Sequence, residues 1–116
     1  MPHVVFGEKI DLQSILEKFT PIFQNKPHLI KIQEIFLDKQ KRKMLLSTVV
    51  IDERHQEFLI EVLSNEQKTT IRLFPKTDPE KTDGVKSALG LVSNFIQKVN
   101  PSASITKTNI EDFIPK

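Results

Sequence analysis

The chain of 116 residues carries 17 Lys and Arg against 15 Asp and Glu, a formal net charge of +2, and it contains no cysteine. This length fits one domain, residues 1–116, and the near balance of charge argues against a general polyanion binder. The absence of cysteine excludes disulfides, thiolate catalysis and cysteine-ligated zinc. Tryptophan and tyrosine are also absent, yet 38% of the residues are hydrophobic, which excludes a disordered chain.

Two missing signals favour a cytoplasmic protein. The opening segment, residues 1–7, lacks the basic region and the long apolar core of a secretory signal peptide. No run of apolar residues approaches the roughly 20 positions that a membrane-spanning helix needs. We therefore expect the chain to stay in the cytoplasm and to have no contact with a membrane.

The first predicted elements are a strand over residues 3–6 and a helix that begins after Asp11. Asp11 is a favourable N-cap residue, because its carboxylate accepts a hydrogen bond from the first turn. An apolar stripe at helical spacing follows it: Leu12, Ile15, Leu16 and Phe19. Pro21 and Pro27 bracket the end of this helix and the linker that follows.

The segment from residue 29 to residue 74 has a periodicity of two, which is typical of strands. We predict four strands, over residues 29–37, 43–52, 56–63 and 68–74. The segments between them are short, so consecutive strands should pair as an antiparallel meander.

A second helix is predicted over residues 84–99, with Asp83 as its cap and Asn100–Pro101 at its end. Its apolar stripe is Val85, Ala88, Leu89, Val92, Phe95, Ile96 and Val99. The tail holds a candidate last strand around Ile105. The order β-α-β-β-β-β-α, with or without a last β, predicts a two-layer α+β fold in which both helices pack on one face of an antiparallel sheet.

The two faces of the meander follow from the register, which we predict by giving each turn an even number of residues. Residues that pair across strands share a face. The face expected under the helices then collects Ile30, Ile32, Phe36, Leu45, Val49, Ile51, Phe58, Ile60, Val62, Ile71 and Leu73. An odd turn in one hairpin would exchange some of these residues with the other face.

The opposite face is predicted to carry an apolar patch although no helix covers it. Its members are Ile35, Leu37, Met44, Leu46, Val50, Leu59, Leu63 and Phe74. An uncovered face should alternate to polar residues. The apolar excess therefore predicts an interface for a second copy, a protein partner, a ligand or the tail of the chain, with scattered surface residues as the plain alternative.

Two short segments resemble a known family. The run Gly7–Leu12 with Ile15 is similar to a Gly-x-Lys-hydrophobic-Asp-Leu motif, and Phe95–Val99 is similar to the end of a second helix. Both motifs and the predicted strand order resemble one repeat of the TATA-box-binding protein family. The resemblance implies that fold, and a saddle formed by a homodimer.

Recognition of the TATA box is not implied by the resemblance. The phenylalanine pairs that such proteins wedge into the minor groove have no match in this chain. The turn tips, residues 52–55 and 64–67, are polar and partly acidic. Fold alone is weak support for a function.

Polar clusters in the sequence favour structural roles over chemical ones. A basic turn holds Lys39, Lys41, Arg42 and Lys43, which favours either a phosphate contact or, more simply, a solvated turn that protects a sheet edge. The three histidines have no spacing typical of a metal site. Glu57 and Glu61 are spaced for an ion pair with Arg72 rather than for acid–base catalysis.

These observations rank three functions and predict neither a metal nor another cofactor. The first is a non-catalytic interaction module that binds a second copy or a protein partner through the apolar outer patch. The second is a nucleic-acid-binding accessory protein that uses the basic turn. The third is a binder of an apolar small molecule between the helices and the sheet. Catalysis ranks last, because the sequence shows neither a nucleophile motif nor a glycine-rich phosphate loop.

Overall fold

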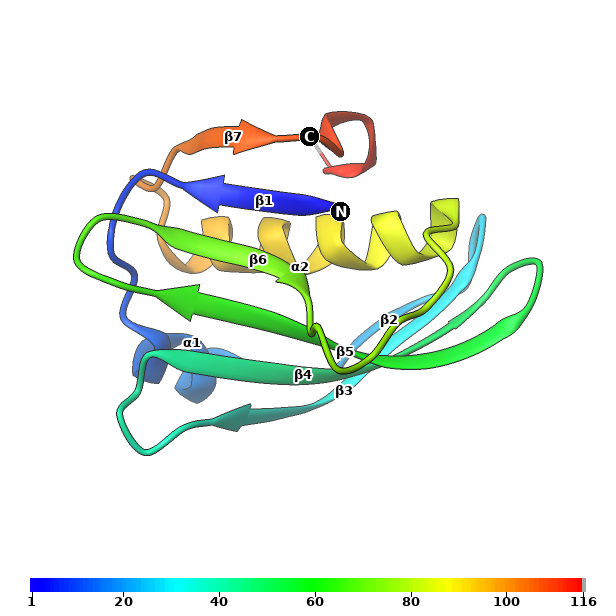
Figure 1. Cartoon of the computed structure of the whole chain (residues 1–116), viewed down its shortest axis with the longest axis horizontal. Helices are drawn as coiled ribbons and strands as arrows, with labels where there is room; N and C mark the ends of the chain where they lie inside the picture. The colour runs from blue at the N-terminus through cyan, green and yellow to red at the C-terminus, as the bar shows by residue number, and fades with distance from the viewer. Residues whose placement is uncertain (116) are drawn as a thin grey trace.

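The computed structural model describes residues 1–115 (Figure 1). Within them the strands are β1 His3–Phe6, β2 Ile22–Gln24, β3 Leu29–Leu37, β4 Lys43–Ile51, β5 His55–Ser64, β6 Thr69–Leu73 and β7 Ile105–Thr108. The helices are α1 Leu12–Lys18, α2 Asp83–Val99 and the short 3₁₀ helix η1 Glu111–Phe113. The predicted strands and helices are all present, and no predicted bound differs from the observed one by more than one residue. β2 and η1 were not predicted.

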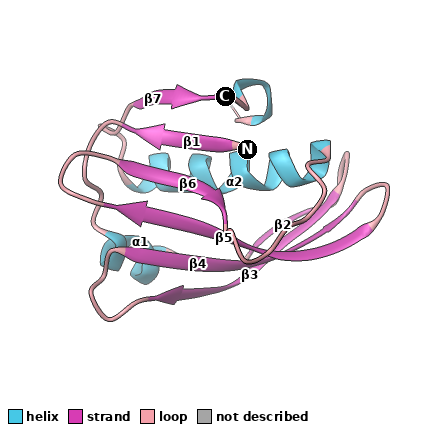
Figure 2. Cartoon of the chain, in the orientation of Figure 1, coloured by secondary structure: helices cyan, strands magenta, loops and turns pink. Residues whose placement is uncertain are grey.

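These strands form one curled antiparallel sheet with the order β2-β3-β4-β5-β6-β1-β7 (Figure 2). The meander from β3 to β6 follows the chain, as expected from its short connections. β1 then pairs with β6 on one side and with β7 on the other, so the two ends of the chain lie together. With α1 and α2 packed on the sheet, the α+β prediction is confirmed.

Both helices begin at a capping side chain. The Asp11 carboxylate accepts a hydrogen bond from the backbone N–H of Gln13 at 3.1 Å, as predicted. The cap of α2 is Thr82 rather than Asp83, because Thr82 keeps an extended backbone and its hydroxyl accepts from the Val85 N–H. Asp83 is the first helical residue, where its negative charge suits the positive end of the helix dipole.

The predicted register is wrong in β4, for two local reasons. The turn between β4 and β5 holds three residues, 52–54, so Ile51 pairs with His55. A bulge in β3 between Ile32 and Glu34 shifts the register by one residue, so that Ile32 pairs with Thr48. With an even turn and no bulge, Ile32 would pair with the residue next to Thr48. A shift of one residue moves a side chain to the other face of a sheet. The pairing of Phe36 with Leu45 is as predicted, but the face on which the pair lies is not.

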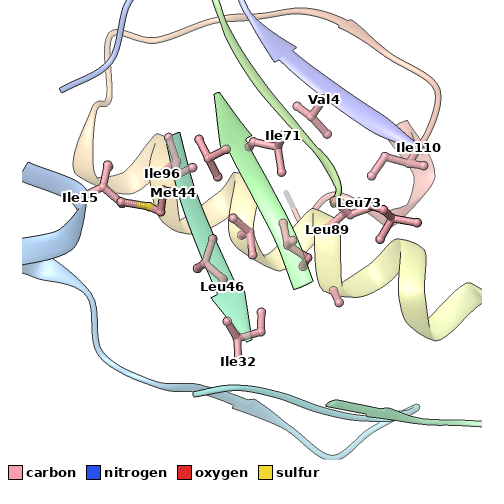
Figure 3. Packing of buried hydrophobic residues seen from close by; sticks show 14 of the residues in the cluster. Val4, Ile15, Ile32, Met44, Leu46, Ile71, Leu73, Leu89, Ile96 and Ile110 are labelled. Atoms are coloured by element: carbon pink, nitrogen blue, oxygen red, sulfur yellow. The ribbon is translucent and has the colours of Figure 1, made fainter. Parts of the chain in front are cut away.

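The helix-facing side of β3 and β4 is therefore different from the prediction. Phe36, Leu45, Val49 and Ile51 lie on the face away from the helices. Five residues assigned to the outer patch lie on the helix face instead: Ile35, Leu37, Met44, Leu46 and Val50. Met44, Leu46 and Val50 are fully buried, and Figure 3 shows Met44 and Leu46 among the core side chains. Placing them outside was an error of register.

The core between sheet and helices is one connected cluster. Its sheet side includes Ile71 and Leu73, and its helix side includes Ile15, Leu89 and Ile96 (Figure 3). The rings of Phe19 and Phe95 meet edge to face, with centroids 5.8 Å apart, and join the end of α1 to α2. Neither helix in the described part of the chain is long and apolar enough to span a membrane.

The C-terminal tail closes the helix layer from the side of β7. η1 packs against α2 at Gly90, where an added Cβ would lie 2.0 Å from the carbonyl oxygen of Phe113. Only glycine permits this approach of one backbone to another. The Lys86 ammonium lies over the Phe113 ring, 5.5 Å from its centroid.

Candidate interaction face

The outer face is the side of the sheet that the helices leave uncovered. The register places on it nine apolar residues: Val5, Phe23, Leu29, Phe36, Leu45, Val49, Ile51, Leu59 and Leu63. It also holds six charged residues: Lys31, Glu34, Lys43, Glu57, Glu61 and Arg72. Of the predicted patch residues that lie in strands, only Leu59 and Leu63 are on this face.

Three large side chains on the outer face are open to solvent. Phe23, Phe36 and Ile51 are 60, 53 and 41% exposed, and they are the most exposed large hydrophobic residues of the described chain after Met1. All three lie on β2, β3 and β4, so the apolar surface is concentrated on one half of the sheet. Single exposed hydrophobics are ordinary, but a group on one face is typical of an interface.

Phe74 lies beyond β6, where the chain leaves the sheet. Its backbone N–H donates to the Leu59 carbonyl at 2.9 Å. The Thr77 hydroxyl accepts a hydrogen bond from the Leu59 N–H at 3.4 Å, so this loop pairs with the part of β5 that lies beyond the end of β6. The Phe74 side chain is half-buried. It belongs to the border of the outer face rather than to its centre.

One carboxylate on the outer face is removed from solvent. The Glu61 side chain is 1% exposed, and its Oε1 accepts a hydrogen bond from Arg72 Nε at 2.7 Å. Lys43 Nζ lies 3.8 Å from the other oxygen. The predicted pair of Glu61 with Arg72 is thus present. Glu57 instead contacts His55 at 3.2 Å and stays exposed.

The centre of the outer face is hollowed beside the β3 bulge. The hollow measures about 350 Å³, and its lining includes Glu34, Ser47, Val49, Glu57 and Leu59. The Ser47 hydroxyl donates to Glu34 Oε1 at 3.4 Å. The hollow is shallow and mixed in polarity, which suits one or two side chains of a partner better than a buried small molecule.

The basic turn between β3 and β4 is ordered by Asp38. Burial by itself raises the pKa of Asp38, but hydrogen bonds from the backbone N–H groups of Lys43 and Arg42 outweigh it and hold the pKa below its usual value. Lys41 has a left-handed backbone, with φ of 61°. The side chains of Lys39, Lys41 and Arg42 remain exposed, while Lys43 turns to Glu61.

A groove of about 610 Å³ at this end of the sheet brings the basic turn together with the start of α1. Lys41 and Arg42 line it from one side, and Lys9 and Glu66 line it from the other. Lys9 Nζ and Glu66 Oε1 are 2.9 Å apart, and this contact lowers the pKa of Glu66. The groove therefore combines cations with acidic side chains and is not a uniform phosphate site.

The histidines lie apart from one another in the structure. The ring of His3 contacts the Met1 carbonyl at 2.9 Å, and His55 contacts Glu57. Within residues 1–115, no group of three or more His, Asp and Glu side chains is arranged to hold a metal ion.

Comparisons of the chain with protein-family models, with characterised proteins and with solved structures return no match.

The sequence carried one signal for the correct outer face that the even-turn assumption overlooked. In β3 the buried residues Ile30 and Ile32 are followed by a gap of three to Ile35 and then by Leu37. Such a break in an alternating pattern indicates a bulge. β4 carried no such signal, because its outward-facing Leu45, Val49 and Ile51 are as apolar as its buried side. Phe23 was missed because β2 was not predicted.

Proposed function

We propose that this chain is a non-catalytic interaction module that binds protein, either a second copy or another chain, through the outer face. The observation that carries the proposal is the exposure of Phe23, Phe36 and Ile51 on one uncovered side of the sheet. Leu45 pairs with Phe36, and Val49 and Leu59 line the hollow on the same face, so apolar side chains lie on the three neighbouring strands β3, β4 and β5. Burial of such a surface stabilises an association by about 25 cal/mol per Å² of apolar area before the entropic costs are subtracted.

The charges of the outer face favour protein over nucleic acid as the partner. Glu34 and Glu57 project from the central strands and would repel phosphates. The Glu61 carboxylate is compensated by Arg72, so the face combines both signs in nearly equal number. A mixed apolar and charged surface of this kind is typical of protein–protein interfaces.

Site-specific photo-crosslinking in the cell that produces the chain tests this proposal. A photoreactive residue at position 36 should give covalent adducts with protein, because Phe36 is exposed on the outer face. The matched control is position 98, an exposed site on α2 at the opposite side of the molecule. The substitution Leu59→Glu on the same face should suppress the adducts from position 36. Equal adduct formation at both positions, or none at position 36, would contradict the proposal.

Binding of nucleic acid is the second candidate function, and the basic end of the sheet favours it. Lys39, Lys41 and Arg42 are exposed there, and Lys9 lies across the same groove. The resemblance to one repeat of the TATA-box-binding protein family supports this candidate too. Acidic Glu66 within the groove weighs against it.

Titration of duplex and single-stranded nucleic acid at several salt concentrations tests the second candidate. The triple variant Lys39→Gln, Lys41→Gln and Arg42→Gln should bind more weakly, and for duplex DNA the logarithmic salt slope should fall by about 0.9 for each phosphate that the variant no longer neutralises. Identical curves for the variant and the wild type would remove the basic turn as the site. The third candidate, an apolar ligand between helices and sheet, gains no support from this region, where the buried side chains form one connected cluster.

A further inference from the structure

We infer that the occupant of the outer face is a second copy of this chain, joined about a twofold axis that runs along β4 and pairs Lys31 of each copy with Glu57 of the other. The inference rests on the proposed function and adds to it the identity of the partner and the register of the contact. Three properties of the outer face support it: the uncharged outward side of β4 from Leu45 to Ile51, the arrangement of charges beside β4, and the area of the face.

The first property is that the outward side of β4 is uncharged from Leu45 to Ile51. A residue on a twofold axis contacts its own copy, so a charged residue there would face a like charge. The outward residues from Leu45 to Ile51 are Leu45, Ser47, Val49 and Ile51, and none carries a charge. Three of the four are apolar, which lets β4 of one copy pack on β4 of the other. Lys43, at the start of β4, lies outside this uncharged stretch; its ammonium is 3.8 Å from Glu61, the carboxylate that also pairs with Arg72.

The second property is the pairing of opposite charges on the two sides of β4. Lys31 pairs with Val49 on one side, and Val49 pairs with Glu57 on the other, so the three residues form one row across the sheet. The two charges lie at about one strand spacing, ~4.8 Å, on either side of Val49. Rotation about an axis along β4 exchanges the two sides and keeps each row in place. Lys31 then faces Glu57 of the second copy, twice in each dimer.

The spacing of packed sheets suits this contact. Face-to-face sheets are about 10 Å apart, which an extended lysine and a glutamate span together. The Glu57 side chain is 71% exposed and its contact with His55 is a surface one, so it is available to a second copy. Lys31 lies over the Phe23 ring with Nζ 5.9 Å from the centroid, which directs the ammonium outward beside an exposed aromatic side chain.

The other rows from Leu45 to Ile51 bring no like charges together about this axis; at the start of β4, Lys43 faces Lys43 of the second copy, and the nearby Glu61 carboxylate reduces that repulsion. Leu29 and His55 flank Ile51, Glu34 and Leu59 flank Ser47, and Phe36 and Glu61 flank Leu45. Phe36 would cover the Glu61–Arg72 pair of the second copy, where the guanidinium offers a flat cationic surface to the ring. From Leu45 to Ile51 the face is therefore self-complementary in charge.

The third property is the area of the face. β4 has nine residues, and a strand of this length extends about 30 Å; the strands β2 to β6 together are about 24 Å wide at most. Because β2 and β6 are short, each copy offers roughly 500–700 Å². That is slightly less than the ~800 Å² per partner of a standard interface. We therefore expect a dimer with a dissociation constant in the micromolar range.

Sedimentation of charge-reversal variants from below to well above micromolar concentration tests the inference. Lys31→Glu alone and Glu57→Lys alone should each weaken the dimer at least about tenfold, because each places two pairs of like charges in the contact. An equimolar mixture of the two variants should recover the dimer as a heterodimer, since both pairs are then opposite again. Recovery also shows that both variants are folded. Lys98→Glu and Glu17→Lys, exposed changes of the same charge on the helices, should leave the dimer unchanged.

Contrary results would overturn either the second copy as the occupant of the outer face or the position of the twofold axis. A wild-type chain that stays monomeric far above micromolar concentration overturns the second copy as occupant. Adducts of position 36 with a different protein would then leave the proposed function standing. A dimer that neither reversal weakens, or one that the mixture does not recover, overturns the axis. If a mixture of Lys31→Glu with Glu34→Lys recovers the dimer and a mixture with Glu57→Lys does not, the axis along β4 is wrong. The twofold axis then runs across the strands.

Discussion

Replacement of Asp52 by alanine removes the carboxylate that joins the β4–β5 turn to the first turn of α2. Asp52 Oδ2 accepts a hydrogen bond from the Gly84 N–H at 3.1 Å, and Thr82, the cap of the same helix, hydrogen-bonds to the carboxylate as well. A Cβ at position 84 would lie 2.5 Å from Oδ2, so glycine permits the approach. A residue distant in the sequence thus takes part in capping α2.

The size of the effect follows from the two interactions that the substitution removes. A capping side chain contributes about 0.5–2 kcal/mol. A negative charge near a helix N-terminus adds about 0.3–1 kcal/mol. We expect Asp52→Ala to lower the free energy of unfolding by about 1–2 kcal/mol and the Tm by roughly 4–8 °C. Asp52→Asn should lose less, because the amide oxygen can still accept from Gly84.

The pH dependence of this difference checks the reasoning. Burial raises the pKa of Asp52, but hydrogen bonds from Thr82 and from backbone N–H groups, including that of Gly84, outweigh it and hold the pKa below the usual 3.8. A lowered pKa means that the charge stabilises the fold above pH 3.8 and that this contribution is lost as the pH falls through the folded-state pKa.

Denaturant unfolding of the wild type and of Asp52→Asn from about pH 7 to about pH 2 measures this contribution. The stability gap between the two proteins should close at the acid end. A gap that is constant over the whole range, or an Asp52→Ala variant as stable as the wild type at neutral pH, would refute the role of this carboxylate.

Three other substitutions test separate parts of the structure. Gly90→Ala should destabilise the fold by about 1–3 kcal/mol and increase hydrogen exchange in the tail, because the new Cβ meets the Phe113 carbonyl; unchanged exchange would argue against the contact. Arg72→Met should cost about 2–4 kcal/mol by leaving Glu61 buried without its closest cation, and Glu61→Leu added to it should restore most of the loss in chemical unfolding. Lys41→Gly should raise the Tm slightly, since lysine is strained by about 1 kcal/mol at a φ of 61°; a lower Tm would contradict this.

The elements of this fold follow from local patterns, and the sequence predicts them well. Asp11 and the apolar stripe after it specify α1, and the alternation between residues 29 and 74 specifies the meander. Short connections then require antiparallel neighbours, so the strand order of the meander also follows. β2 was missed because its three residues are too few for a periodic pattern.

The outer face depends on features that no local pattern expresses. β4 is apolar on both sides, so its pattern fits either orientation equally well, and the three-residue turn after Ile51 decides which side is buried. That choice placed Met44 and Leu46 in the core and exposed Ile51. The sequence could indicate that an apolar surface remained uncovered, but not which residues form it.

Tertiary structure also decided the contacts between distant segments. Glu61 and Arg72 were close enough in sequence to be predicted as a pair, because both lie on one hairpin. The contacts of Asp52 with Gly84 and of Gly90 with Phe113 join segments that only the packed helix layer brings together. The sequence by itself determined which elements form and that the sheet is apolar on two sides; the register and the long-range packing determined which side faces solvent. The physical reason is that secondary structure depends on neighbouring residues, whereas the orientation of a two-sided strand depends on the single-residue geometry of its turns and bulges.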